Sequence, residues 1–122
     1  MPKVCPLPFS LIRDFLQVLL LSLLLFVSTC LCKMHCGTDE LQNTVAHNHM
    51  TIYCPQHYDH ANNCCFQHDD CYGKQKGRKK CDDAFCGCLR KKMSESLCAI
   101  VANQFCDLVQ VFGQPAYDRS RA

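Results

Sequence analysis

The chain has 122 residues, 13 of them cysteine, and a formal net charge of +2. A charge so close to neutral excludes recognition of a partner through bulk charge alone. Cysteine at this density argues against an ordinary cytosolic domain and is typical of a small secreted domain, because disulfides persist in oxidising compartments.

Residues 1–32 have the features of a secretory signal peptide. Their apolar run, residues 16–27, is far shorter than the roughly 20 residues that a membrane span needs, so an anchor is the weaker interpretation. Cleavage after Cys32 would leave ten cysteines, an even number, whereas cleavage after Cys30 would leave an odd thiol. The remaining domain, residues 33–122, is small enough to need covalent staples. Zinc is a poor explanation of its cysteines, because they form no repeated C-x-x-C pairs.

The first predicted helix covers residues 38–48, where a capping threonine precedes acidic residues and apolar residues recur at helical spacing. Residues 50–60 show no clear period and are predicted to form a loop. Four histidines in and beside this loop could bind a transition metal, although solvated side chains are the simpler explanation. They are His47, His49, His57 and His60.

A second helix is predicted from about Ala61 onward, and it places Cys64, His68 and Cys71 on one face. A third is predicted from about Asp82, and there Cys81 and Cys88 are again seven residues apart. Pairing Cys64 with Cys88 and Cys71 with Cys81 gives equal sums of residue numbers, as two antiparallel helices that face each other would. On that arrangement Asp82 lies near the face that looks toward His68 and Tyr72.

Basic residues crowd the segment between these two helices and follow the second of them. Such a cluster could attract anionic lipid or nucleic acid, but a solvated loop and a helix end with a favourable dipole explain it equally well. A last amphipathic helix is predicted from about Ser96 to Phe112, with Gly113 and Pro115 stopping it. No strand pattern is convincing, so the predicted fold class is all-α.

The pattern C-C-x-x-H-D-x-C-Y from Cys64, followed by C-D-x-x-F-x-x-C-L from Cys81, resembles the secreted phospholipase A2 family. The resemblance covers roughly residues 61–92 and is weak elsewhere. It implies a small, disulfide-rich, all-α fold with two antiparallel linked helices. It also implies hydrolysis of the sn-2 ester of glycerophospholipids to a fatty acid and a lysophospholipid, at a membrane surface.

Carried over by position, the resemblance implies that His68 is the general base and that Asp82 orients it. Tyr72 would hydrogen-bond Asp82, and Asp69 would ligate calcium. Histidine suits the role of the base, because its pKa lies near the working pH of such an enzyme. The resemblance also implies the disulfides Cys64–Cys88 and Cys71–Cys81, and one from Cys65 to a cysteine of the calcium loop.

The chain departs from the family at that loop, where the family has Y-C-G-x-G. Tyr53-Cys54-Pro55-Gln56-His57 has the expected place in chain order but lacks both glycines, and it is favoured here, which pairs Cys54 with Cys65. The alternative, residues 35–39, keeps one glycine but precedes the first helix. Four cysteines then remain, with three possible connectivities: Cys36, Cys86, Cys98 and Cys106.

A second departure is the short connection between the two paired helices. Nine residues separate Cys71 from Cys81, too few for the β-hairpin that brings another tyrosine to the supporting aspartate in the family. The expectation is a secreted, extracellular, monomeric phospholipase A2-like hydrolase that uses calcium and binds a phospholipid membrane and no nucleic acid. Two alternatives are an inactive relative that binds a receptor or membrane, and a cationic antimicrobial protein.

Overall fold

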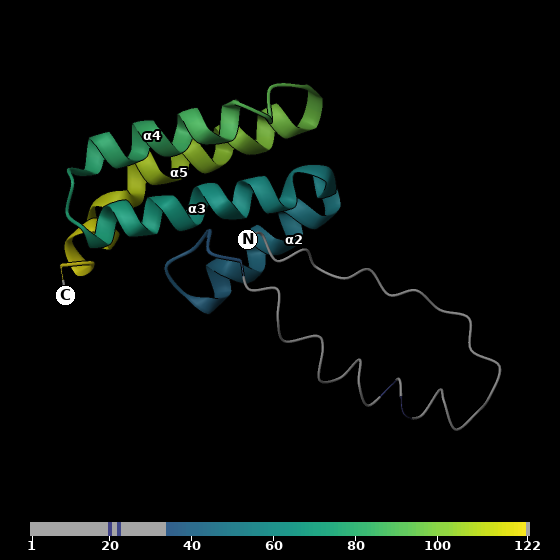
Figure 1. Ribbon diagram of the computed structural model, residues 1–122, viewed down its shortest axis with the longest axis horizontal. Helices are drawn as coiled ribbons and strands as arrows, with labels where there is room; N and C mark the ends of the chain where they lie inside the picture. The colour runs from purple at the N-terminus through teal and green to yellow at the C-terminus, as the bar shows by residue number, and fades with distance from the viewer. Residues whose placement is uncertain (1–19, 21, 23–33, 122) are drawn as a thin grey trace. The chain divides into compact units, whose positions relative to one another are not determined.

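The computed structural model describes Leu20, Ser22 and residues 34–121 of the chain (Figure 1). The chain divides into two compact units, Met1–Lys33 and Met34–Ala122, and the second carries the features that follow. Apart from Leu20 and Ser22, the predicted signal peptide lies outside the described residues, so its cleavage after Cys32 stays a prediction. None of the described helices combines the length and hydropathy that crossing a membrane requires.

The second unit is all-helical, and no strand occurs among its described residues, which confirms the predicted fold class. In chain order the elements are α2 (Glu40–Tyr53), the short 3-10 helix η1 (Pro55–His57), α3 (Tyr58–Gly73), α4 (Arg78–Arg90) and α5 (Ser96–Arg119). Helices α3 and α4 run antiparallel, α5 packs along α4, and α2 also contacts α5 (Figure 1). The cysteines spaced seven residues apart on α3 and α4 lie at the contact between these two helices.

Helix α2 begins close to the predicted position but continues to Tyr53. Asp39 caps it, because its carboxylate accepts a hydrogen bond of 2.8 Å from the backbone N–H of Gln42. Its buried side chains are Ala46 and Met50, whereas Leu41 is 74% exposed. The apolar spacing therefore predicts the helix correctly but includes residues that face solvent.

The turn between α3 and α4 is shorter than predicted, because α3 extends to Gly73 and α4 already begins at Arg78. Two residues in the turn have positive φ: Gln75 at 51° and Gly77 at 100°. Only glycine adopts the second value without a steric penalty, so Gly77 is the residue that permits the tight reversal.

The sequence predicts that α5 ends at Gly113 or Pro115, but the helix continues to Arg119. Proline leaves the carbonyl four residues earlier without its helical partner, and that residue, Val111, is exposed, so water can satisfy it. The turn beyond is held by tertiary contacts: the Tyr117 hydroxyl accepts a hydrogen bond of 2.9 Å from the backbone N–H of Gly77. Packing thus overrides the local stop signal.

Five disulfides link the described residues. They are Cys36–Cys65, Cys54–Cys98, Cys64–Cys88, Cys71–Cys81 and Cys86–Cys106. The pairs Cys64–Cys88 and Cys71–Cys81 confirm the antiparallel arrangement. This number of disulfides fits an extracellular protein.

The predicted pairing of Cys54 with Cys65 is wrong. Cys54 follows α2 and meets the first turns of α5 at Cys98, with Cα atoms 5.6 Å apart. Cys65 lies in the middle of α3 and instead meets Cys36, in the segment before α2, with Cα atoms 4.9 Å apart. Chain order alone could not distinguish these partners, because both are set by how α2 packs.

Sulfur dominates the core between the helices. All seven buried cysteines belong to disulfides, and three methionines fill the remaining space beside Leu89, Val101 and Ala102; the methionines are Met34, Met50 and Met93. Methionine adapts to irregular gaps between covalent links. The core thereby holds α3 and α4 at a fixed separation, which positions the polar residues described next.

Candidate active site

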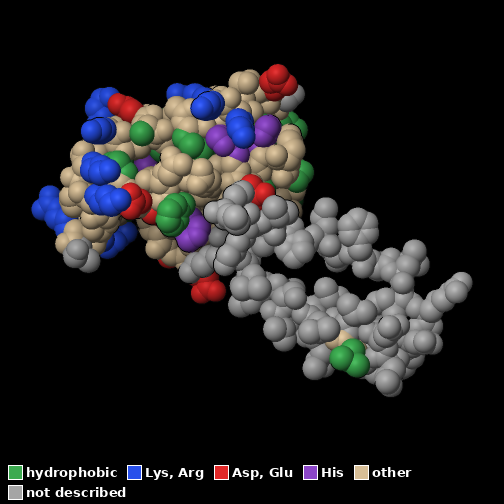
Figure 2. All heavy atoms as spheres, in the orientation of Figure 1, with side chains coloured by type: hydrophobic (Ala, Val, Ile, Leu, Met, Phe, Trp, Pro, Cys, Tyr) green, Lys and Arg blue, Asp and Glu red, His purple; other side chains and the backbone are tan. Residues whose placement is uncertain are grey.

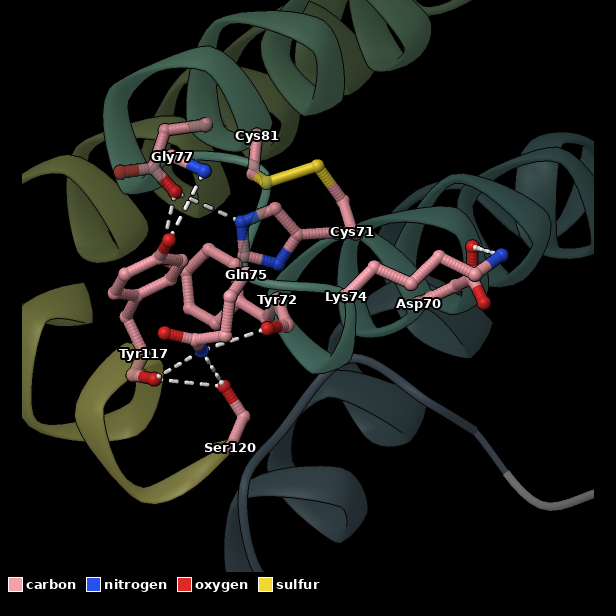
Figure 3. The surroundings of a disulfide bond; sticks show 11 residues. Asp70, Cys71, Tyr72, Lys74, Gln75, Gly77, Cys81, Tyr117 and Ser120 are labelled. Carbon is pink, nitrogen blue, oxygen red and sulfur yellow. Dashed lines mark hydrogen bonds and ion pairs between the residues drawn. A yellow bond between two sulfur atoms is a disulfide. The ribbon is translucent and has the colours of Figure 1, made fainter. Parts of the chain in front are cut away.

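A histidine and an aspartate meet in the interior between α3 and α4. His68 is 8% exposed and Asp82 is 1% exposed. The Nε2 atom of His68 lies 2.8 Å from Oδ1 of Asp82, and the Tyr72 hydroxyl donates to the same oxygen at 2.6 Å. Figure 3 shows the Cys71–Cys81 disulfide, which joins the two helices beside Tyr72. The structure therefore brings together His68, Asp82 and Tyr72, as the sequence predicts.

The hydrogen bond fixes which nitrogen of His68 carries the proton. An ionised carboxylate only accepts, so Nε2–H is the donor and Nδ1 keeps a free lone pair. No described residue hydrogen-bonds Nδ1. Burial lowers the pKa of His68, and the hydrogen bond and negative charge of Asp82 oppose this only in part. The neutral imidazole at neutral pH is the form that can accept a proton.

Aromatic rings hold the imidazole in its orientation. The ring centroid of His68 lies 4.1 Å from that of Tyr72 and 4.8 Å from that of Phe85. Burial first, and then the bond to Asp82, raises the pKa of the Tyr72 hydroxyl well above its usual value, so it remains a donor. On its far side, a Cβ atom added at Gly113 of α5 would come within 2.5 Å of this hydroxyl oxygen. The glycine lets α5 approach the site closely.

Asp69, the next residue along α3, lines a pocket of about 310 Å³ that Tyr72 also lines. Its lining comes from the segment before α2, from α3 and from the end of α5: Gly37, Thr38, Asp69, Tyr72, Ala116, Arg119 and Ser120. The Cys36–Cys65 disulfide places Gly37 here, since Cys65 lies one helical turn before Asp69.

No residue of the favoured calcium-loop segment, Tyr53 to His57, lines this pocket, whereas Gly37 and Thr38 of the alternative segment, residues 35–39, do. The end of η1 at His57 immediately precedes α3, so a helix rise of 1.5 Å per residue separates it from Asp69 by about 18 Å along the axis. Gly37 also has a packing role, because a Cβ atom there would lie 2.6 Å from the backbone nitrogen of Asn43. Gly37, the one glycine kept from the family pattern, therefore allows the segment before α2 to pack closely against the start of that helix.

The residues around Asp69 offer the kind of ligand atom, oxygen, that a hard cation such as calcium binds. Calcium prefers carboxylate, carbonyl and hydroxyl oxygens, and the pocket offers Asp69 with the hydroxyls of Thr38 and Ser120. Although Asp69 as a whole residue is exposed, partial withdrawal of its carboxyl from water raises its pKa to about 6. No described side chain forms an ion pair or hydrogen bond with the Asp69 carboxylate. A bound cation would stabilise its negative charge and lower its pKa again.

Sequence reasoning missed Arg78, the first residue of α4. Its Nη1 donates to Oδ2 of Asp82 at 3.1 Å and to the backbone carbonyl of Gln110 at 3.0 Å. The spacing of four residues from Arg78 to Asp82 is the signal that could have found it, since residues four apart face each other on a helix. By composition alone, Arg78 is only one of the basic residues between the two predicted helices.

The histidines considered as a metal site do not gather. His47 lies 2.6 Å from the Tyr58 hydroxyl, and His60 lies 2.7 Å from the Cys88 carbonyl. In the described part of the chain, the one cluster with ligand-like separations is His60 with two cysteine sulfurs, and those sulfurs form the Cys64–Cys88 disulfide. Sulfurs bonded to each other do not supply the thiolates that a transition metal requires.

Basic side chains gather at the end of the unit where the α3–α4 turn meets the C-terminal end of α5 (Figure 2). Exposed lysines and arginines there come from both segments: Lys74, Lys76, Lys79, Lys80, Arg119 and Arg121. We call these residues the basic end. Arg119 also lines the pocket of Asp69, so this charge reaches the candidate site itself.

The chain is 47% identical over 87 residues to a phospholipase A2-like protein of Caenorhabditis elegans. The match covers 70% of the chain and 50% of the relative, so the chain spans about half the length of the curated relative that it matches. No protein-family model matches the chain, and no solved structure does. The relationship nevertheless agrees with the residue pattern from Cys64 to Leu89 and with the paired helices that carry it. The chain is therefore a homologue of a phospholipase A2-like protein.

Proposed function

We propose that the protein is a secreted phospholipase A2-like enzyme that hydrolyses the sn-2 ester of glycerophospholipids to a fatty acid and a lysophospholipid. The observation that carries this proposal is the buried contact of 2.8 Å between His68 and Asp82, with Nδ1 of His68 unpaired among the described residues. A neutral imidazole with one nitrogen tied to a carboxylate and the other open is the arrangement of a general base.

In the proposed reaction, Nδ1 of His68 accepts a proton from water while the water oxygen attacks the ester carbonyl. Asp82 stabilises the imidazolium that forms, and Tyr72 keeps the carboxylate in place. The imidazolium then returns its proton to the departing alkoxide, which leaves as the lysophospholipid, and the fatty acid is the other product. General base catalysis of this kind typically contributes 10²- to 10⁴-fold, which is about 3 to 5 kcal/mol.

Asp69 is the residue that would hold calcium, with oxygens of residues 37–38 beside it. Bound there, calcium would stabilise negative charge on the ester oxygen as a Lewis acid. The chain's own contribution is to place the Asp69 carboxylate one residue from the base, on the same rigid helix.

A second candidate function is a non-catalytic binding protein for a receptor or a membrane. Arg119 favours it, because this cation lines the same pocket as Asp69 and could neutralise that carboxylate in place of calcium. Such a protein would keep the buried His68–Asp82 pair as a structural hydrogen bond only.

The deciding experiment expresses the full chain in a secretory host and purifies the oxidised protein from the medium. Fatty acid release from mixed phospholipid vesicles is then measured with calcium and with chelator, for the wild type and for His68→Gln. Release that requires His68 supports the enzyme. Absence of release from both proteins, with vesicle binding retained in chelator, would instead identify the binding protein.

A further inference from the structure

The carboxylate of Asp82 is held at both oxygens. Oδ1 accepts from His68 and Tyr72, whereas Oδ2 accepts from Arg78 at 3.1 Å. Within the described residues, Arg78 is the one donor to Oδ2. The Asp82 side chain is 2% exposed and that of Arg78 is 30% exposed, so the contact is largely shielded from water at the aspartate.

The last torsion of aspartate has a broad, shallow profile, so the plane of the carboxylate is held by its hydrogen-bond partners and not by the side chain itself. His68 and Tyr72 hold only Oδ1, and a donor on Oδ2 restricts the same plane at its second oxygen. Arg78 can do this because its guanidinium is planar, permanently charged and carries its donors in a fixed fork. The hydrogen-bonding plane that His68 meets is therefore set in part by Arg78.

The same Arg78 nitrogen also reaches the backbone of α5, through the Gln110 carbonyl at 3.0 Å. Three residues further on, Gly113 packs against the Tyr72 hydroxyl. Gln75, in the α3–α4 turn, donates to the carbonyl of Tyr117, near the end of α5, at 2.9 Å. Figure 3 shows this contact. Helix α5 is thus attached on both sides of the aspartate, and Arg78 is the link that touches the carboxylate itself.

We propose that Arg78 is a positioning residue that holds Asp82 in the orientation His68 needs and makes that orientation depend on the docking of α5. The catalytic consequence rests on the proposed function, whereas the structural consequence does not. The short α3–α4 turn has no room for a second tyrosine at this carboxylate, and the arginine occupies the oxygen that would otherwise be left without a donor.

Other charged or titratable groups around the contact do not replace Arg78. His68 and Tyr72 face Asp82 from α3, and both bind its other oxygen. Tyr117 of α5 packs edge-on against Tyr72, with ring centroids 5.1 Å apart, and its hydroxyl accepts from Gly77. Lys79 of α4 pairs at 2.6 Å with Asp83 on the exposed side of the helix. Loss of the guanidinium would leave Oδ2 unsatisfied and the carboxylate without a counter-ion.

Arg78→Gln and Arg78→Lys test the proposal in the full, oxidised chain. Glutamine removes the charge, and lysine keeps the charge without the planar fork. Arg90→Gln is the matched control, because it removes one arginine charge and one contact from α4 to α5, the hydrogen bond of 3.2 Å to Asn103, at an exposed position outside the basic end. Vesicle hydrolysis gives kcat and KM, and proton NMR follows the downfield resonance of the His68 Nε2 proton, assigned by its loss in His68→Gln.

For Arg78→Gln we expect kcat to fall about tenfold with KM little changed, as for loss of a supporting partner of a reactive group. The Nε2 proton should shift or broaden as its acceptor turns. Arg78→Lys should recover part of both effects, and Arg90→Gln should match the wild type. An unmoved Nε2 resonance together with wild-type kcat in folded Arg78→Gln would overturn the proposal, and so would equal effects of Arg78→Gln and Arg90→Gln.

The NMR measurement separates this proposal from the proposed function. If neither the wild type nor any variant hydrolyses vesicles, the enzymatic function fails, but a shifted Nε2 proton in the Arg78 variants still shows that Arg78 positions the aspartate. If Arg78→Gln does not fold, Arg78→Lys decides. A folded lysine variant with unchanged resonance and kcat would show that the fork geometry has no positioning role.

Discussion

At the scale of single residues, the buried aspartate is the most heavily constrained group in the site. Asp82 accepts hydrogen bonds from His68, Tyr72 and Arg78, so its charge is compensated inside a small core. A buried carboxylate without such donors would be costly. Three donors at one carboxylate fix its orientation. Because the imidazole of His68 is bonded to this carboxylate, they also fix the orientation of the imidazole.

His68→Gln and Asp82→Asn should therefore differ in effect. Glutamine removes the proton acceptor and should abolish vesicle hydrolysis, a loss of at least about 10³-fold. Asparagine leaves the imidazole in place but poorly oriented, so a measurable remainder should survive a loss of about 10²-fold. Steady-state release of fatty acid measures both, with near-ultraviolet circular dichroism as the control for folding. Equal and complete loss in two folded variants would show that Asp82 does more than orient the base.

The raised pKa of Asp69, about 6 in the folded protein against an ordinary value of 3.8, makes stability depend on pH. A carboxyl with a raised folded-state pKa favours the folded state below pH 3.8, and this contribution is lost as pH rises through about 6. Asp69→Asn cannot ionise, so in chelator its melting temperature should exceed that of the wild type at pH 7 and match it near pH 4. An equal difference at both pH values would contradict this origin of the effect.

Calcium should reverse the penalty at Asp69, because the ion binds the ionised carboxylate. Affinity measured by calorimetry should weaken below about pH 6, where a proton competes with the ion. Binding at pH 5 should release protons, which buffers of different ionisation enthalpy detect. Affinity that does not change between pH 5 and pH 7 would exclude Asp69 as a ligand.

At the scale of helices, local patterns and tertiary contacts are predictable to different degrees. The seven-residue spacing of cysteines predicts the α3–α4 pair and its two disulfides, because both depend only on helix periodicity. The partners of Cys54 and Cys65 depend on how α2 folds back on α3 and α5, which no local pattern encodes. The end of α5 was missed for the same reason, since contacts of Tyr117 with the α3–α4 turn outweigh Pro115.

The same division applies to the site. His68, Asp82 and Tyr72 belong to the paired helices, and their meeting follows from the register of those helices. The contact of Arg78 with Asp82 was accessible from their spacing of four residues on α4, whereas Gly113 joins the site through α5, whose position along α4 was not predictable from spacing. The segment that lies beside Asp69 was not predictable from chain order, because the Cys36–Cys65 link places Gly37 there.

Two disulfides should separate stability from activity. Replacing Cys54 and Cys98 by serine opens a loop of 44 residues and should cost about 4 kcal/mol by chain entropy. Replacing Cys71 and Cys81 opens one of 10 residues and should cost about 3 kcal/mol. The second change should nevertheless reduce kcat more, because this bond joins the helices of His68 and Asp82. Denaturant unfolding and vesicle hydrolysis of both double variants measure the two effects, and a larger kcat loss in the Cys54/Cys98 variant would contradict this reasoning.

At the scale of the folded unit, apolar and basic surface lie along the same helix. Phe112 is 69% exposed and Val111 is 68% exposed, and both precede the turns of α5 that line the Asp69 pocket. Further along α5, Arg119 belongs to the basic end. Apolar side chains beside cationic ones fit a surface that meets an anionic lipid interface.

If this surface seats the protein on a membrane, Phe112→Ser should weaken binding to anionic vesicles about tenfold, because one large apolar side chain no longer inserts. Hydrolysis of a dispersed short-chain phospholipid should stay unchanged, since the His68–Asp82 contact is intact. Ile52→Ser is the matched control: Ile52 is 68% exposed on α2, near the opposite end of α5. Sedimentation with vesicles at low and high salt measures both variants. Equal weakening by Ile52→Ser would mean that exposed apolar area in general binds lipid, and that α5 has no special part in bringing the substrate to His68.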